Sequence, residues 1–411
     1  MVKYPKGMIR MLFKNIILDG KITDILVKNG MIEKIAPNLS DDEVIDCTGL
    51  TAIPSFIDLH VHLREPGFEH KETVFTGTLA ARNGGFSDVF CMPNTKPVCD
   101  SVEVVKMILE KEKNVRVHPV CAITKGQQGK ELCDFGAYKE AGIIAVSDDG
   151  MPVPDDDILE KAMLSAKENG LLVISHCENK SVITDKLNIP SEAEYSDVIR
   201  VIGLAEKTGA KVHLAHISTK ESVAAIREAK KAGIDVSAET CPHYFTITAD
   251  AFDIHGPNAM MNPPLRFEAD KEAILEALTD GTFDVLSTDH APHSIEEKSV
   301  DPYKAPFGII GLETSFPLSY SALVKTGIMS LSDLSKLMSE APAKRAGIAI
   351  PTIKEGASAD FVAADLKNTF VFDKEKCLSK SRNTPFSGRE MTGRAVYSIV
   401  KGDVFKCQPI F

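Results

Sequence analysis

The chain has 411 residues and carries 47 Lys and Arg against 58 Asp and Glu, a net charge of −11. Apolar residues make up 44% and charged residues 26%, which excludes a disordered, collagen-like or coiled-coil chain. The acidic balance argues against binding to nucleic acid, because phosphate contacts need clustered cations. No stretch approaches about 18 consecutive apolar residues, so we expect no membrane-spanning helix.

The N-terminal region shows no sustained apolar core and no small-residue cleavage site, so we interpret it as the start of a folded domain. The nine cysteines form no CxxC pair, which favours reduced thiols and a cytoplasmic protein. Cys91, Cys177 and Cys241 lie near expected strand ends, and we interpret them as buried or partly buried thiols rather than metal ligands.

Both ends of the chain show short β-like runs. In residues 8–50 the runs are separated by Asp-Gly and Asn-Gly pairs, which are typical of tight hairpins. Short β-like runs separated by turn residues occur again at residues 350–411. The sequence therefore predicts one small composite β domain, built from residues 1–52 and 349–411.

Between these ends, apolar runs alternate with helical patterns. The expected helices include residues 155–170 and 219–234. Eight runs are expected strands: 51–62, 87–94, 115–124, 143–150, 171–179, 211–219, 234–244 and 283–293. Eight strand–helix units in series predict an α/β fold, a parallel (β/α)₈ TIM-like barrel, over residues 53–348.

Polar residues collect where these strands end, which is where such barrels carry their chemistry. On the first strand, alternation predicts that Asp58, His60 and His62 face one way. Leu59 and Val61 should face the other way, toward the helices. Two imidazoles so spaced can bind one metal, whereas the alternative is a pair of hydrogen-bonded core histidines.

Four further strands end in possible ligands: Asp149, His176, His216 and Asp289. A lone histidine at such a position is more often structural, but the matching heights of these residues favour a shared site. Imidazoles with carboxylates suit zinc and other borderline divalent ions. Six ligands exceed the need of one tetrahedral zinc and would suffice for two metals with a bridging group. We assign His70, His118, His243 and His255 to structural or surface roles.

Eight motifs carry a resemblance to a known family. In chain order they are DLHVHLREPGFEHKET, MPNTKP, SDDG, SHCEN, AHIST, MNPPLR, TDHAPH and APFGIIGLET. Together they resemble dihydroorotases of the longer bacterial class, within the amidohydrolase superfamily, and the match runs from about residue 8 to 405. The resemblance implies zinc-dependent, reversible cyclisation of N-carbamoyl-L-aspartate to (S)-dihydroorotate, the third step of de novo pyrimidine synthesis.

The resemblance also implies the site residues. One or two zinc ions would be bound by His60, His62, Asp149, His176, His216 and Asp289. Asp289 would also be catalytic, taking the proton of the attacking water and delivering it to the leaving nitrogen. The substrate would contact Arg64, Asn94, Asn262, His293, Phe307 and Gly308.

Two assignments rest on position. The choice of Asp149 rather than Asp148 as the ligand rests on the spacing of 27 residues to His176, and the resemblance implies that this carboxylate can bridge two metals. Arg64 lies just past the metal histidines and can bind a substrate carboxylate with two parallel hydrogen bonds. In the alternative interpretation Arg64 pairs with Glu65 or Glu69 and only shapes the loop.

Other functions stay open. Hydantoinases carry a carboxylated lysine at the end of the fourth strand, where this chain has Ser-Asp-Asp-Gly at 147–150, which argues against that activity. The enzyme alternative is another cyclic amidase, an allantoinase or a dihydropyrimidinase. A non-catalytic relative that braces aspartate transcarbamoylase is the other alternative. Expected partners are the small-molecule substrate and either further copies of the chain or aspartate transcarbamoylase.

Overall fold

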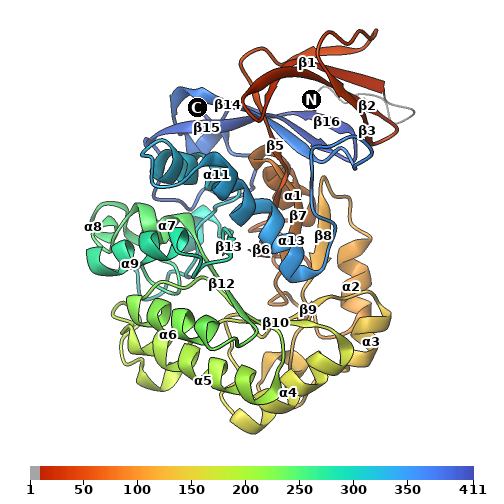
Figure 1. The fold of residues 1–411 in the computed structure, drawn as a ribbon. Coiled ribbons are helices and arrows are strands. Elements are labelled where there is room, and N and C mark those ends of the chain that lie inside the picture. Colours follow the sequence, from red (N-terminus) through yellow and green to blue (C-terminus); the bar gives the residue numbers. More distant parts are fainter. Residues whose placement is uncertain (1–9) are drawn as a thin grey trace.

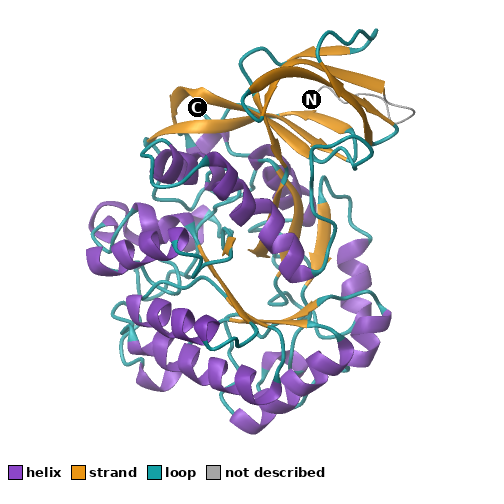
Figure 2. Ribbon diagram, in the orientation of Figure 1, coloured by secondary structure: helices purple, strands orange, loops and turns teal. Residues whose placement is uncertain are grey.

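The computed structural model describes residues 10–411, so the part of the N-terminal prediction that falls on residues 1–9 lies outside the described residues. A mixed β-sheet occupies one end of the molecule, and parallel strands surrounded by helices form the rest (Figure 1, Figure 2). Within residues 10–411, no helix has the length and apolar character needed to cross a membrane.

The mixed sheet has eight strands, taken from both ends of the chain. The strands are β1 (Arg10–Leu18), β2 (Lys21–Lys28), β3 (Met31–Ala36), β4 (Val44–Asp46), β5 (Thr51–Pro54), β14 (Phe361–Val371), β15 (Glu390–Val400) and β16 (Asp403–Lys406). β5 joins the two halves, since it pairs with β1 and with β14. The rings of Phe13 and Phe361 meet edge to face at 5.0 Å in the core of this sheet. The predicted division of the chain at residues 52 and 348 stays a prediction.

The predicted hairpins are confirmed. Asp19 and Gly20 connect β1 to β2 with φ of 48° and 76°. Asn29 and Gly30 connect β2 to β3 with φ of 53° and 78°. Positive φ at both central residues is the turn geometry that matches the twist of paired strands, and Asn-Gly and Asp-Gly adopt it readily.

Each of the eight apolar runs contains one strand of a parallel sheet. The strands are β6 (Phe56–Val61), β7 (Phe86–Cys91), β8 (Arg116–Pro119), β9 (Ala145–Val146), β10 (Leu172–Ser175), β11 (Val212–Leu214), β12 (Val236–Thr240) and β13 (Val285–Leu286). β6–β8 form one sheet and β9–β13 a second. Isolated parallel bridges, from Cys121 to Val146 and from Val61 to His290, connect the edges of the two sheets.

Two predictions about the first parallel strand were wrong. The run 51–62 is two strands, because it passes at Pro54 and Ser55 from β5 in the mixed sheet to β6 in the parallel sheet. Leu59 does not share the packing of Val61 but lies in an apolar cluster with Ile57, lined by neighbouring parallel strands. The cause is a register shift against β7 between Asp58 and Val61, which breaks the alternation of side chains.

Helices surround the parallel strands (Figure 2). The main helices are α1 (Val74–Gly84), α2 (Val102–Leu109), α3 (Phe135–Glu140), α4 (Asp156–Asn169), α5 (Glu192–Thr208), α6 (Lys220–Lys231) and α9 (Glu268–Thr279). Shorter ones are α7 (Pro242–Thr246), α8 (Ala251–His255), α10 (Ile295–Lys298), α11 (Ser315–Ser319), α12 (Leu331–Ser335) and α13 (Ala341–Ala346). α4 and α6 confirm the two helices predicted over 155–170 and 219–234. α6 buries Val223, Ile226 and Ala229, the apolar stripe that predicted it.

Candidate active site

The carboxyl ends of the parallel strands meet at a cavity of about 230 Å³. Every residue predicted for the site lines it except His60, which is fully buried. The lining residues are His62, Arg64, Asn94, Asp149, Gly150, His176, His216, Asn262, Asp289, Ala291, His293, Phe307 and Gly308. Residues from segments far apart in the sequence therefore converge on one small space, as the predicted fold requires.

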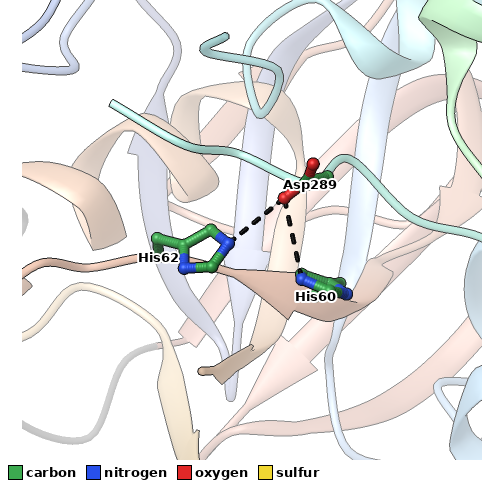
Figure 3. Close-up of side chains that lie close together, drawn as sticks. All are labelled: His60, His62 and Asp289. Atoms are coloured by element: carbon green, nitrogen blue, oxygen red, sulfur yellow. Dashed lines mark hydrogen bonds and ion pairs between the residues drawn. The ribbon is translucent and has the colours of Figure 1, made fainter. Parts of the chain in front are cut away.

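We define the floor of the cavity as the six predicted metal ligands: His60, His62, Asp149, His176, His216 and Asp289. An oxygen of Asp289 lies 3.2 Å from Nε2 of His62 and 3.6 Å from Nε2 of His60 (Figure 3). Asp149 lies 3.3 Å from Nε2 of His60. Its oxygens also lie 3.6 Å from both His62 and His176. The two carboxylates thus share the same group of imidazoles.

Several nitrogen atoms of the floor have no hydrogen-bond partner among the described residues. Nε2 of His60, Nε2 of His176 and Nδ1 of His216 are buried and form no hydrogen bond with the described residues. Leaving such atoms unpaired costs free energy, so buried polar atoms normally have a ligand, a water or a protein partner. Two ring nitrogens, of His176 and His216, approach within 2.8 Å.

The floor fits a divalent metal. Its ligand atoms form two groups in which all atoms lie within 4.8 Å of one another. One group is His60, His62 and Asp289, and the other is His60, Asp149 and His216. Imidazole and carboxylate are the ligands that zinc and similar ions take in proteins. A metal would also give the unpaired imidazole nitrogens a partner.

Charge in the floor is strongly coupled. Burial works to raise the pKa of Asp289, but His62 and His60 lower it to about 2. Burial likewise opposes ionisation of Asp149, but His60 and His216 hold its pKa well below the ordinary value. Burial disfavours the charged form of His60, yet Asp149 and Glu239 raise its pKa well above the usual range. Both carboxylates are therefore ionised at neutral pH.

Three site residues have left-handed backbone geometry. φ is 62° at Arg64, 36° at His216 and 47° at Asp289. This region is uncommon for residues with a side chain, and such residues concentrate at functional sites. At these points the chain leaves the regular strand geometry, so simple alternation along a strand could not predict where these side chains point.

The structure separates the two adjacent carboxylates of the fourth parallel strand. Asp149 lies in the floor, whereas Asp148 accepts hydrogen bonds from the backbone N–H of Ile123 at 2.8 Å and of Thr124 at 3.2 Å. The hydroxyl of Thr124 also donates to Asp148. Asp148 is therefore engaged by the neighbouring loop, which agrees with the prediction of Asp149 as the ligand.

Sequence reasoning missed Glu239. This carboxylate on β12 is fully buried beneath the floor. It lies 3.2 Å from Nδ1 of His60 and accepts a hydrogen bond from Nε2 of His213 at 3.0 Å. Ser287 donates to it as well. The signal was an acidic residue inside a strand, but Glu239 precedes the end of that strand, and the sequence argument for ligands applied only to strand ends.

We define the rim of the cavity as Arg64, Lys71, His293 and segment 303–308. Arg64 donates from Nε to the carbonyl of Pro292 at 3.1 Å. It is not paired as the alternative interpretation proposed, because Glu65 pairs with Lys111 and Glu69 accepts from the backbone of the following loop. Nη1 of Arg64 forms no hydrogen bond within the described part of the chain. Burial lowers the pKa of Arg64 to about 10, so it stays charged and available to an anion.

His293 is held as a neutral imidazole. Burial, followed by the charges of Arg64 and Lys71, lowers its pKa far below the ordinary value. A carbonyl can only accept, so Nε2 of His293 carries the ring proton and donates to the carbonyl of Phe307 at 2.7 Å. Nδ1 then accepts a hydrogen bond from Nζ of Lys71 at 3.2 Å. Nη2 of Arg64 also lies 3.2 Å from Nε2, to which it does not donate in this tautomer.

The two predicted asparagines face protein partners on the cavity wall. Asn94 contacts Nδ1 of His62 at 2.8 Å through its oxygen and donates to Asp149 at 3.1 Å. Asn262 donates to Glu178 at 2.8 Å, a second residue that sequence reasoning missed. Asn94 therefore links the rim side of the cavity to the floor, and each amide retains one hydrogen for a ligand.

Solved structures with the same fold are enzymes that open cyclic amides. An L-hydantoinase (dihydropyrimidinase) from Arthrobacter aurescens matches with a TM-score of 0.87, 26% identity and 98% of both chains covered. A dihydropyrimidinase from Brevibacillus agri matches with a TM-score of 0.86 and 25% identity, covering 96% of this chain and 95% of its own. The fold and the site thus define a cyclic amide hydrolase of the amidohydrolase type.

Sequence comparison narrows the class. The family model described as dihydro-orotase-like matches residues 49–222. A dihydroorotase from Elusimicrobium minutum is 46% identical over 405 residues, 94% of each chain. One from Acetivibrio thermocellus is 43% identical over 401 residues, covering 93% of this chain and 94% of its own. The chain belongs to the dihydroorotase family.

Proposed function

We propose that the chain is a zinc-dependent dihydroorotase that interconverts N-carbamoyl-L-aspartate and (S)-dihydroorotate in de novo pyrimidine synthesis. The observation that carries the proposal is the pairing of a metal-compatible floor with a charged guanidinium at the rim, that of Arg64. Support for the fold comes from the two bridges between the parallel sheets, which would close the eight strands into one (β/α)₈ barrel.

The floor would hold one or two zinc ions through the six residues that define it. Such an ion polarises an amide carbonyl and lowers the pKa of a bound water. Asp289, ionised at neutral pH, accepts the proton of the attacking water and then donates it to the ring nitrogen as the amide bond breaks. In the reverse direction Asp289 removes a proton from the carbamoyl nitrogen and delivers it to the departing oxygen. Ring closure consumes one proton overall, so acid favours dihydroorotate.

The rim would hold the substrate carboxylate that both reactants keep. Arg64 offers free donors on the cavity side, and a bidentate guanidinium–carboxylate pair fixes orientation as well as charge. Asn94 and Asn262 each retain an amide hydrogen toward the same space. The Phe307–Gly308 backbone completes the proposed contact set, and His293 supports it by holding the carbonyl of Phe307.

The proposal is tested by assaying purified protein with dihydroorotate, hydantoin and allantoin in parallel, together with elemental analysis. We expect turnover of dihydroorotate alone and at least one zinc per chain. Turnover of hydantoin or allantoin in preference to dihydroorotate would favour another cyclic amidase, and active protein without a transition metal would exclude the metal. A cytoplasmic location and association with further copies or with aspartate transcarbamoylase stay predictions.

A further inference from the structure

Lys298, the last residue of α10, is buried although a lysine is ordinarily exposed to solvent. The residue is 4% exposed and forms no ion pair with any residue in 10–411. Burial, together with the nearby charges of Lys186 and Arg64, lowers its pKa to about 7. A buried cation beside other cations costs free energy, so the contacts that retain it identify what it does.

Those contacts are three backbone carbonyls, one for each ammonium hydrogen. Nζ of Lys298 donates to Pro306 at 2.9 Å, to Gly308 at 2.9 Å and to Met260 at 3.3 Å. Pro306 and Gly308 flank Phe307 in the rim, and Met260 lies two residues before Asn262. Lys298 therefore joins two segments that both reach the cavity.

Other donors hold the remaining carbonyls of the segment. Lys186 donates to Tyr303 at 2.9 Å and to Ala305 at 2.6 Å, and its Nζ lies 5.1 Å from the ring centre of Phe307. Asn383 donates to Gly308 at 3.0 Å. Side chains therefore donate hydrogen bonds to every carbonyl from Ala305 to Gly308, and to that of Tyr303.

Gly308 packs so closely against Ala291 that only glycine fits at this position. Its φ is 131°, a conformation that residues with a side chain rarely adopt. A Cβ at this position would lie 2.6 Å from the Cβ of Ala291. The N–H of Gly308 donates to Met260 at 2.9 Å, the same carbonyl that Lys298 binds.

We propose that Lys298 is a positioning residue that preforms the substrate-binding backbone at Phe307–Gly308 by fixing it to the segment before Asn262. The inference rests on the proposed function, since it assigns that backbone to substrate binding. Lys298 acts before the substrate arrives, so its loss should weaken binding more than it slows the chemical step.

The test compares Lys298→Met with Lys161→Met, a control with the same substitution at a lysine of α4, outside the rim. Lys161 is exposed, and its side chain forms no hydrogen bond or ion pair within residues 10–411. Lys298→Met should fold, because the carbonyl of Gly308 keeps a second donor in Asn383. A lost hydrogen bond to a charged group predicts a KM about tenfold higher for dihydroorotate, with kcat changed less than about threefold. The control should match the wild type.

Hydrogen exchange at the Gly308 amide gives a readout that does not depend on activity. In the wild type this amide should be protected before dihydroorotate is added and gain little on binding, while Lys298→Met should expose it. An unprotected amide in the free wild type, or faster exchange in Lys298→Met with an unchanged KM, would overturn the proposal. A wild type that does not turn over dihydroorotate would instead contradict the proposed function, and the exchange result would still stand.

Discussion

The floor and the rim of the cavity differ in how far the protein satisfies its own polar atoms. In the floor, imidazole nitrogens of three histidines are buried without a hydrogen-bond partner. In the rim, successive carbonyls are bound by lysines, an asparagine and an imidazole. The comparison indicates that the floor is completed by a bound ion, whereas the rim is organised by the protein alone.

Charge follows the same division. The floor contains two carboxylates and a third, Glu239, beneath them, so it attracts a cation. The rim contains the cationic side chains of Arg64 and Lys71, so it attracts an anion. A small substrate with an amide at one end and a carboxylate at the other would meet each region with the group that suits it.

The largest expected effect falls on the floor at Asp289. Asp289→Asn keeps the side-chain volume but cannot accept a proton, so turnover should fall about 10²–10⁴-fold in both directions, the usual range for a general acid–base residue. Metal content must be measured on the same sample, because Asp289 also lies 3.2 Å from His62. Turnover close to the wild type in metal-replete Asp289→Asn would remove Asp289 from the mechanism.

A smaller effect is expected one layer lower, at Glu239. Its carboxylate faces Nδ1 of His60 at 3.2 Å and so can fix the ring with Nε2 toward the cavity. Loss of such an outer partner typically weakens metal binding about 10–100-fold, so Glu239→Gln should release metal to a chelator at lower concentration. The matched control is Glu313→Gln, a buried carboxylate bound to Asn83 outside the floor. Equal metal affinity in both variants would show that Glu239 serves only the fold.

At the rim we expect about a tenfold effect from Arg64→Met, since a charge-assisted hydrogen bond contributes roughly 1.5–3 kcal/mol and about 1.4 kcal/mol is a factor of ten. The loss in kcat/KM should appear with dihydroorotate and not with an uncharged ring analogue. The carbonyl of Pro292 also loses its donor, so a thermal melt should accompany the kinetics. An equal loss with both substrates would assign Arg64 to loop structure alone.

The strand ends were predictable because parallel strands place their carboxyl ends on one side. That single rule brought His176, His216 and Asp289 together from separate apolar runs. The side-chain directions that strict alternation along a strand does not predict have local causes. The register shift after Asp58 redirects Leu59, and positive φ turns His216 and Asp289 out of their strands.

Residues that act through others were harder to predict. Glu239 lies before the end of its strand, and only the buried partner His213 reveals that its carboxylate has a role. Lys298 lies in a polar loop, where a lysine is ordinarily solvated, and its burial depends on carbonyls from two distant segments. Such contacts between segments leave no periodic signal in a sequence.

The smallest effect on activity is expected at Asp88, which resembles Asp289 in having a pKa of about 2. Burial raises the pKa of Asp88, but His118 and Arg116 outweigh it. The floor contains imidazole nitrogens without a hydrogen-bond partner, whereas both oxygens of Asp88 are hydrogen-bonded. Arg116 donates to them at 2.8 and 2.7 Å, and His118 contacts one at 2.8 Å. Arg116 also donates to Asp360 at 2.9 Å and so ties β8 to the mixed sheet.

Asp88→Asn should therefore leave turnover near the wild-type value but lower the free energy of unfolding at pH 7 by about 2–3 kcal/mol, at about 1.4 kcal/mol per pKa unit. Because the pKa of Asp88 is lower in the folded state, this stabilisation is complete above about pH 5 and decreases as the pH falls toward 2. Urea unfolding should show the difference from the wild type shrinking to about half near pH 3. Asp157→Asn, at an exposed position in α4, is the control. A large loss of turnover in folded Asp88→Asn would contradict the contrast drawn between Asp88 and the floor, since a paired carboxylate outside the floor would then matter to the chemistry.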